Sequence, residues 1–439
     1  MGMIGYKSEV GVVALAAAAV VAIPFVPRGF RLAAVPLWAA LSRMVASGST
    51  NRARPASHKA SAEEQKRSPF VVRPDMEIQD RPVAIVTGTN SGIGLHTAAG
   101  LALEGYLVVA TGRTKTVADI AVRRVHAAAQ RKRAADPKRY EHCPETLFVA
   151  AGVVENDDFK SIRAFADWFK KRFASHNLVL LVNNAGAMQK ALTFSRHNLQ
   201  IETTTAVNFL GPMLLTELLL PLLEQNGGGR VVYVSSEAHR AGQMFVEAAQ
   251  SGARLAGSLK GRLLAAVKAV NSGKEGASGP LAGAEPIANF RRYGMSKLLG
   301  TYYTHHVARR YRTAPAQSRV VACSLHPGCV VTNFSNKLLG GEHALPARIF
   351  RSVGLLFFKS CEEGAQTTLH CAMCPKEELE LEYPLPAKKG EAATKKPEDA
   401  VSRYFVECSA KTHSMLLPCG WDVEEAENVV AWGKGLIGV

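Results

Sequence analysis

Tyr293 and Lys297 stand four residues apart in the segment Tyr293-Gly294-Met295-Ser296-Lys297. On a helix this spacing puts both side chains on one face, one turn apart. A free tyrosine has a pKa of about 10, which is too high for a base at neutral pH. A nearby ammonium favours the phenolate and lowers that pKa. The pair could therefore act as a general acid and base beside a substrate hydroxyl, although solvated neighbours on many helices share the spacing.

A glycine-rich turn lies where a nucleotide could bind. Gly88, Gly92 and Gly94 form a G-x-x-x-G-x-G pattern between the apolar run Val83–Thr87 and a helical stretch that ends near Glu104. Such glycines let the backbone approach a pyrophosphate, and a helix N-terminus supplies amide donors and a positive dipole end. The glycines alone are weak evidence, but a strand before them and a helix after them strengthen the prediction of a dinucleotide site.

Short apolar runs alternate with helical stretches along the rest of the chain. This alternation predicts an α/β fold: a doubly wound parallel sheet (Rossmann fold) with helices on both faces. Ligands bind at the carboxyl ends of the strands in such sheets. The expected strands are Val83–Thr87, Leu107–Thr111, Leu147–Ala151, Leu178–Val182, Val231–Ser235 and Val320–Ser324.

The motifs resemble those of the short-chain dehydrogenase/reductase family, in the family's order and over roughly residues 81–439. They are the cofactor turn Thr87–Gly94, the N-N-A-G of Asn183–Gly186, Asn208 in V-N-F-L-G, the pair Ser235-Ser236 after a strand, Y-x-x-x-K, and the turn His326-Pro327-Gly328 with Thr332. The S-S-x-A-H at Ser235–His239 and the E-G-A-Q-T at Glu363–Thr367 are similar to those of the retinol dehydrogenase-like group. That group often carries an N-terminal membrane anchor.

The resemblance implies a catalytic set of Asn208, Ser236, Tyr293 and Lys297. Ser236 is preferred to Ser235, because the second serine of the pair holds the substrate oxygen in the family. Asn208 would support a water that links Lys297 to solvent. Without the resemblance, the two serines could simply end a strand, Asn208 could be a satisfied polar residue inside a helix, and the N-N-A-G segment could be only a tight turn.

The resemblance also implies a nicotinamide cofactor and the residues that bind it. They are Gly88, Asn90, Ser91, Gly92, Ile93, Gly94, Arg113, Glu155, Asn184, Ala185, Gly186, Tyr293, Lys297, Pro327, Gly328 and Thr332. Where the second strand ends, Gly112 and Arg113 stand in place of the acid that binds the ribose 2′-hydroxyl in NAD enzymes. Arg113 can pair with a 2′-phosphate, so we expect NADP(H) rather than NAD(H), unless Arg113 faces solvent.

The N-terminus reads as a separate segment. Val10–Val26 is an apolar run of about 17 residues, the lower limit for spanning a bilayer, and arginines follow it. Positive charge on this side predicts an anchor, within residues 1–45, that leaves the catalytic domain in the cytosol on an endoplasmic reticulum-like membrane. A mitochondrial presequence and a cleaved secretory signal are the alternatives. Residues 46–79 read as a basic linker, and 80–439 as a single catalytic domain.

Composition limits the class of protein. With 439 residues, 47% hydrophobic and 21% charged, the chain is neither wholly disordered nor collagen-like. Eight cysteines are too few for a disulfide scaffold. The net charge of +16 suits anionic partners, but no nucleic-acid-binding module is present. No metal site is expected, since Cys371-x-x-Cys374 has zinc or redox spacing without a second pair and reads as two thiols near a helix end.

Three inserts depart from the family pattern, near residues 123–139, 241–285 and 385–400. The first is a basic segment that reads as a solvated helix, and the third is a charged loop. The second contains Ala253–Val270, a basic amphipathic helix that could lie on a membrane, cover a substrate, or pack on the domain as an ordinary surface helix. The variable loop between Phe334 and Phe358 is apolar, which fits either a lipophilic substrate or a plain buried helix.

The sequence therefore predicts a membrane-anchored, NADP(H)-dependent oxidoreductase. It would interconvert a hydroxyl and a carbonyl on a lipophilic molecule of the retinoid, steroid or lipid-aldehyde type. The alternative is a membrane-tethered nucleotide-binding scaffold without turnover, which the presence of all four catalytic residues disfavours. Pairing as a homodimer, as in many relatives, is left open.

Overall fold

The structure is a computed structural model of the chain. It describes residues 76–141, 143–198, 201–225, 227–240, 262–271, 285–315, 318–328, 330, 359–380, 401–411 and 423–439. The predicted anchor, nearly all of the linker, Thr332, the loop between Phe334 and Phe358, the segment 385–400 and most of the 241–285 insert lie outside these residues. The predictions made for those parts therefore stay predictions.

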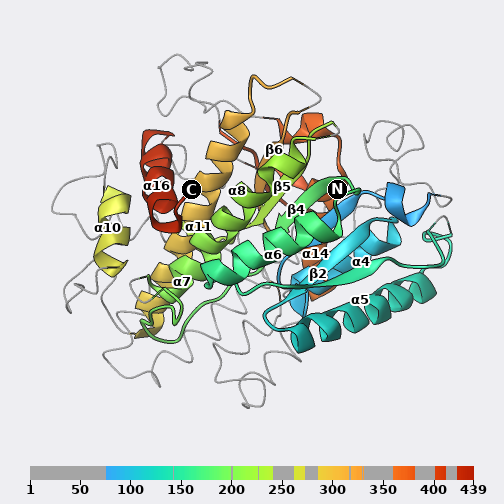
Figure 1. Cartoon of the computed structure of the whole chain (residues 1–439). Coiled ribbons are helices and arrows are strands. Elements are labelled where there is room, and N and C mark those ends of the chain that lie inside the picture. Colours follow the sequence, from blue (N-terminus) through green and yellow to red (C-terminus); the bar gives the residue numbers. More distant parts are fainter. Residues whose placement is uncertain are drawn as a thin grey trace, which may run out of the picture.

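One sheet runs through the protein, with the strand order β3-β2-β1-β4-β5-β6-β7-β8 (Figure 1). Strands β1 to β7 are parallel, and β8 pairs antiparallel with β7. The order reverses between β1 and β4, which makes the sheet doubly wound and confirms the predicted Rossmann-like fold. The strands are β1 Val83–Val86, β2 Leu107–Gly112, β3 Val149–Val153, β4 Leu178–Asn183, β5 Arg230–Val234, β6 Val321–His326, β7 Tyr404–Val406 and β8 Ser409–Ala410.

Helices cover both faces of the sheet, because successive strand residues point to opposite sides. Val83 and Ile85 of β1 join one apolar core, and Ala84 and Val86 join the other. The first core includes α6 Phe159–Arg172, α8 Gly211–Leu223, α11 Glu285–Arg310 and α16 Val423–Ile437. The second includes α4 Gly92–Leu103, α5 Lys115–Ala135 and α14 Cys361–Met373. The remaining helical turns are η2 Ile78–Asp80, α7 Thr203–Thr205, the π-helical η3 Ala206–Leu210, α10 Arg262–Asn271 and η4 Lys376–Leu379.

The basic segment 123–139 belongs to the crossover between β2 and β3. It forms the C-terminal half of α5 and the turn that follows. Val125, Ala128 and Ala129 are buried against the second core, while Arg123 and Arg124 are exposed. Most of the positive charge thus lies on the solvent face of a helix that the parallel sheet needs anyway.

Part of the amphipathic segment 253–270 is described as α10. Val267 and Val270 are fully buried in the first core, and Lys268 is exposed. The helix lies beside α16 (Figure 1), where Leu264 N donates to Glu425 Oε1 over 2.9 Å. For these residues, the apolar face is occupied by the domain itself, which favours the reading as an ordinary packed helix.

Among the described residues, one helical stretch is long and apolar enough to cross a membrane. It is Thr203–Leu223, which α7, η3 and α8 form together. Within its most apolar window, 72% is buried inside the protein, against β4 and α6. Its apolar character is therefore that of a core helix.

Substituting a buried residue of α10 tests its packing. Val267→Asp would place an unpaired carboxylate in the core and should lower the free energy of unfolding by about 3–5 kcal/mol. Lys268→Asp, on the exposed side of the same helix, should change it by less than about 0.5 kcal/mol. Denaturant unfolding measures both values, and equal effects would contradict a packed α10.

Candidate active site

Three parts of the chain bring the predicted catalytic residues together at the carboxyl edge of the sheet. Ser236 lies two residues beyond the end of β5, Asn208 lies in η3, and Tyr293 and Lys297 lie on α11. Gly186, which follows β4, lies next to Lys297 and Asn208. A β-carbon added at Gly186 would lie 3.0 Å from Lys297 Nζ and 3.3 Å from Asn208 Oδ1.

The two serines after β5 face different partners. Ser235 is buried, and its hydroxyl is 3.3 Å from both Lys297 O and Thr301 Oγ1, inside the contact between β5 and α11. The Ser236 hydroxyl forms a hydrogen bond with the Tyr293 side chain. It also accepts from Ala238 N over 3.2 Å. Of the pair, Ser236 is thus the serine that lies beside the predicted acid/base.

Asn208 is fully buried and ties η3 to the chain after β4. Its Oδ1 accepts from Ala187 N over 2.7 Å, and its Nδ2 donates to Ala187 O over 2.8 Å and to Ser296 Oγ over 2.9 Å. The Asn208 carbonyl oxygen accepts a hydrogen bond from Tyr233 Oη over 2.7 Å. π-Helical turns are frequently found at functional sites.

Burial sets the charge state of the acid/base pair. Desolvation raises the pKa of Tyr293 to about 12, and the hydrogen bond from Ser236 lowers it only in part. Desolvation also lowers the pKa of Lys297 to about 7. Lys297 Nζ donates to Val234 O over 2.8 Å and lies 5.8 Å from the centre of the Tyr293 ring. In the free protein, burial thus outweighs the expected lowering of the Tyr293 pKa by Lys297.

The glycine-rich turn leaves backbone space at the start of α4. Gly88 and Gly92 have positive φ angles of 71° and 65°, which favour glycine. A β-carbon at Gly94 would lie 2.3 Å from Asn184 Nδ2 and 2.5 Å from Gly88 O. Ser91 is the N-cap of α4, but its side chain makes no capping bond. The first amides of α4 are therefore not capped by this side chain, which fits an anionic group at this end.

The N-N-A-G segment is fastened to the first turn. Asn184 Nδ2 donates to Thr87 O over 2.7 Å, and the backbone amides of Asn184 and Ala185 both donate to Thr87 Oγ1, over 3.0 and 2.9 Å. The segment is more than a tight turn, because it joins the ends of β1 and β4 where a dinucleotide would cross the sheet.

The residues expected around the adenosine half lie on three separate elements. Arg113 is exposed directly after β2. Glu155 is half-buried after β3, with Oε2 3.8 Å from His197 Nε2. Asn90 lies in the turn before α4, where Arg124 of α5 donates to its O and Oδ1 over 2.8 and 3.1 Å. The structure thus adds Arg124 to the basic groups near this turn.

The remaining predicted cofactor residues flank the turn from two sides. Pro327 and Gly328 are buried after β6, and Gly328 has a φ of 90°. A β-carbon there would lie 2.9 Å from Lys359 Cδ, so the turn packs closely on that side chain. Ile93 lies in the first turn of α4, near Gly364 of α14.

Tyr233 is a site residue that the sequence analysis missed. It is 3% exposed on β5, and the centre of its ring lies 5.3 Å from Lys297 Nζ. Burial raises its pKa well above 10, so the hydroxyl stays protonated and keeps donating to Asn208 O. Gly300 on α11 leaves room for the ring, since a β-carbon there would lie 2.0 Å from Tyr233 Cζ. In the sequence, Tyr233 stands in the apolar run V-V-Y-V, which indicates only a buried strand.

Removing the Tyr233 hydroxyl should weaken the fold at this point. Tyr233→Phe leaves the buried Asn208 carbonyl without this donor, and we expect the free energy of unfolding to fall by about 1–3 kcal/mol. Tyr140→Phe is the control, because no hydrogen bond to its hydroxyl is seen among the described residues, and it should stay within about 0.5 kcal/mol. Denaturant unfolding measures both free energies, and equal losses in the two variants would contradict a stabilising hydrogen bond from Tyr233 to Asn208.

The chain is similar in sequence to a family profile and to several known proteins. A family profile described as short chain dehydrogenase matches residues 82–250. Retinol dehydrogenase 12 of Mus musculus is 31% identical over 300 residues, which cover 68% of this chain and 74% of that protein. Retinol dehydrogenase 11 of Homo sapiens is 30% identical over 291 residues, covering 66% and 72%. A solved structure from Mycobacterium paratuberculosis is 20% identical, covers 84% of this chain and 98% of that one, and gives a TM-score of 0.48.

The family profile covers the cofactor turn, the N-N-A-G segment, Asn208 and the serine pair, and the retinol dehydrogenases match about two thirds of the chain. The resemblance stated from the motifs is thereby confirmed: the chain belongs to the short-chain dehydrogenase/reductase family, is retinol dehydrogenase-like, and is an oxidoreductase of the kind that binds a nicotinamide dinucleotide.

Proposed function

We propose that the protein uses NADP(H) to interconvert a hydroxyl and a carbonyl on a lipophilic substrate of the retinoid, steroid or lipid-aldehyde type. The observation that carries the proposal is that Ser236 and Lys297 both lie beside the Tyr293 side chain: Ser236 forms a hydrogen bond with it, and Lys297 Nζ lies 5.8 Å from the centre of its ring. The lipophilic substrate class rests on the retinol dehydrogenases that the chain matches.

The residues present fit a dinucleotide at the glycine-rich turn. Gly94 has no room for a side chain, Gly88 and Gly92 hold left-handed backbone, and the Ser91 side chain leaves the α4 amides uncapped. Gly88, Gly92, Gly94 and the N-N-A-G segment would hold the pyrophosphate and the nicotinamide half. When bound, NADP(H) supplies or accepts the hydride.

Tyr293 would move the proton. With a pKa of about 12, its hydroxyl is protonated at neutral pH and can donate to a carbonyl oxygen during reduction. Ser236 would donate a hydrogen bond to the same oxygen as negative charge develops there. Lys297 would stabilise the phenolate left behind, and Tyr233 and Val234 O would hold the ammonium in place.

The acid/base assignment predicts a loss of turnover and a pH dependence. Tyr293→Phe should lower kcat by a factor of about 10²–10⁴, whereas Tyr140→Phe should not change it. In the oxidation direction the active form is the phenolate. Because the Tyr293 pKa lies above neutrality, kcat/KM for an alcohol should rise with pH up to about 7, and it should level off where Lys297, with a pKa of about 7, loses its own proton.

Steady-state kinetics with retinol and a hydroxysteroid, each with NADP⁺, measure both effects. The dissociation constant for NADPH, from nicotinamide fluorescence, should stay unchanged in Tyr293→Phe. Normal turnover in Tyr293→Phe would disprove the assignment. A folded wild-type protein that binds NADPH but turns over neither alcohol would favour the nucleotide-binding scaffold instead, and one that binds neither NADPH nor NADH would disprove the proposed enzyme.

Cofactor choice depends on Arg113 in this proposal. Arg113 follows β2, which ends in Gly112 rather than in an acidic residue, and pairing of its guanidinium with a 2′-phosphate is a charge-assisted contact. Arg113→Ala should therefore weaken NADPH binding by about 10- to 100-fold, given about 1.5–3 kcal/mol for such a bond. NADH binding should change little.

Arg123→Ala is the matched control, since Arg123 is exposed on α5 beside Arg124. It should leave both dissociation constants unchanged. Fluorescence titration of the wild type and of each variant with NADPH and with NADH gives the six dissociation constants needed. Equal weakening of both cofactors by Arg113→Ala would overturn the proposed NADP(H) preference.

We also propose, from the apolar run Val10–Val26 and the arginines after it, that the protein is held on an endoplasmic reticulum-like membrane with its catalytic domain in the cytosol. Protease protection on isolated membranes distinguishes this arrangement from import into mitochondria. Homodimer formation stays a prediction from the resemblance.

A further inference from the structure

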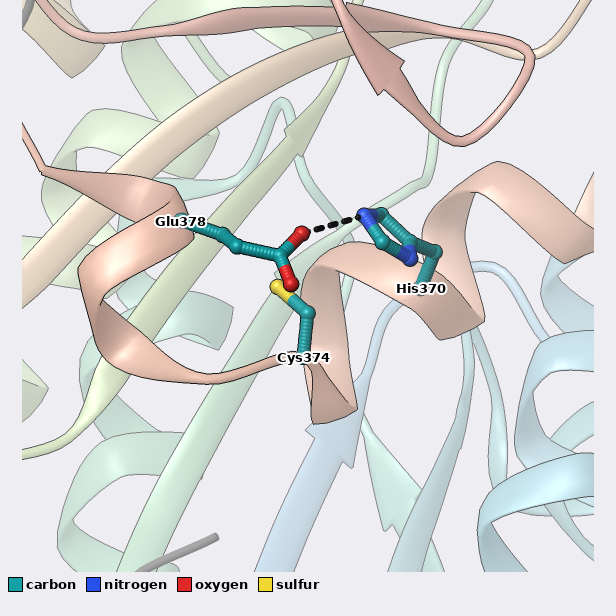
Figure 2. Close-up of side chains that lie close together, drawn as sticks. All are labelled: His370, Cys374 and Glu378. Carbon is teal, nitrogen blue, oxygen red and sulfur yellow. Dashed lines mark ion pairs between the residues drawn. The ribbon is translucent and has the colours of Figure 1, made fainter. Parts of the chain in front are cut away.

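Three side chains that could ligate a metal meet at the C-terminal end of α14. His370, Cys374 and Glu378 are spaced four residues apart, and their donor atoms all lie within 4.8 Å of one another. Figure 2 shows the carboxylate between the imidazole and the sulfur, with Glu378 Oε2 3.2 Å from His370 Nε2. The group combines the last turn of α14, its C-cap residue Cys374 and the short helix η4.

The donor set matches the preferences of Zn²⁺. Imidazole, thiolate and carboxylate are its usual protein ligands, at about 2.0–2.3 Å from the metal. In a tetrahedral site with these bond lengths, the ligand atoms lie about 3.3–3.8 Å apart. The three donor atoms, which lie within 4.8 Å of one another, would therefore have to move only slightly closer together. Glu378 can supply that movement, because its side chain is 47% exposed, whereas those of His370 and Cys374 are buried.

Charge at the site also suits a divalent cation. A Cys374 thiolate and a Glu378 carboxylate carry two negative charges, and histidine binds a metal as the neutral imidazole. The C-terminal end of a helix is its negative end, and Cys374 N already donates to His370 O over 2.8 Å there. The exposed carboxylate gives an ion a way in from solvent.

Arg230 provides an independent reason to expect an anion at the sulfur. It is 1% exposed, and its Nη1 lies 3.3 Å from Cys371 O and 3.9 Å from Cys374 Sγ. Its Nε and Nη2 are buried without a hydrogen-bond partner among the described residues, and a buried cation is costly without an anionic partner. Burial raises the pKa of the Cys374 thiol to about 12, so ligation must displace its proton. A metal-bound thiolate would then give Arg230 the partner it lacks.

We propose that His370, Cys374 and Glu378 form a Zn²⁺ site, with a water as fourth ligand, that fastens η4 to the end of α14. Arg230 is the first residue of β5, so the site lies at the amino edge of the sheet, away from the glycine-rich turn at the carboxyl edge. Its role is therefore to stabilise the fold. The site shares no residue with the proposed oxidoreductase reaction and does not depend on it.

Cobalt is the probe, because it replaces zinc and reports its ligands by colour. The full chain, purified without a polyhistidine tag, reduced and stripped with a chelator, is titrated with Co²⁺ alone. We expect one Co²⁺ per chain, with the visible bands of a tetrahedral site and a near-ultraviolet thiolate charge-transfer band. Added Zn²⁺ should remove both bands, and it should raise the Tm of the stripped protein.

Matched variants identify the ligands. Cys374→Ala should lose the charge-transfer band, whereas Cys361→Ala, at the opposite end of the same helix, should keep it. Glu378→Gln should weaken Co²⁺ binding by about tenfold or more, whereas Glu377→Gln, the neighbouring exposed acid on η4, should not. Circular dichroism of the metal-free proteins shows which variants are folded, and Glu378→Gln, at a half-exposed position, should be.

Two results would overturn the site. One is a folded wild-type protein that gives no tetrahedral cobalt spectrum. The other is an unchanged spectrum and affinity in Glu378→Gln together with an unchanged charge-transfer band in Cys374→Ala, which would place the ion elsewhere. Either result leaves the dinucleotide titrations unaffected, so failure here and failure of the proposed reaction are told apart.

Discussion

One buried ammonium group constrains the whole carboxyl edge of the sheet. Lys297 is 3% exposed, and taking its charge out of water is unfavourable unless polar groups replace the lost hydration. The replacements come from the Val234 carbonyl and the faces of Tyr233 and Tyr293. Strand β5 and helix α11 must therefore hold their spacing closely, and the pKa of about 7 shows that the compensation is incomplete.

The sequence predicted best what depends on local spacing. The glycines before α4 and the pair Tyr293 and Lys297 lie within one turn or one helix face, so their geometry follows from the residues themselves. The choice of Ser236 over Ser235 needed the family, because consecutive strand residues face opposite sides and only the position of α11 decides between them. Tyr233 was missed because only the position of α11 shows that this strand residue faces Lys297. Strand β7 was missed because three residues are too few to show the hydrophobic pattern of a strand.

The charge state of Tyr293 could not be predicted from sequence because two opposing effects act on it and burial, the larger one, depends on the packed structure. A neighbouring cation lowers a phenol pKa and burial raises it. The spacing of Tyr293 and Lys297 reveals the first effect, but only the packed structure reveals the second, which also removes part of the charge from the lysine. A positive group near the ring, supplied by a bound oxidised nicotinamide, would act in the direction that the sequence argument expected.

The close contact between Gly300 and Tyr233 fixes the position of helix α11 on strand β5. The Tyr233 ring occupies the space that a side chain at Gly300 would need. If α11 shifted by one residue or rotated, a residue with a side chain would take the place of Gly300 and clash with the ring. Gly300 follows Tyr293 and Lys297 on the same helix, so this contact also fixes where those two residues lie along β5. The long insert that enters α11 from upstream can therefore vary in length and composition without moving the two residues, which frees that segment to diversify.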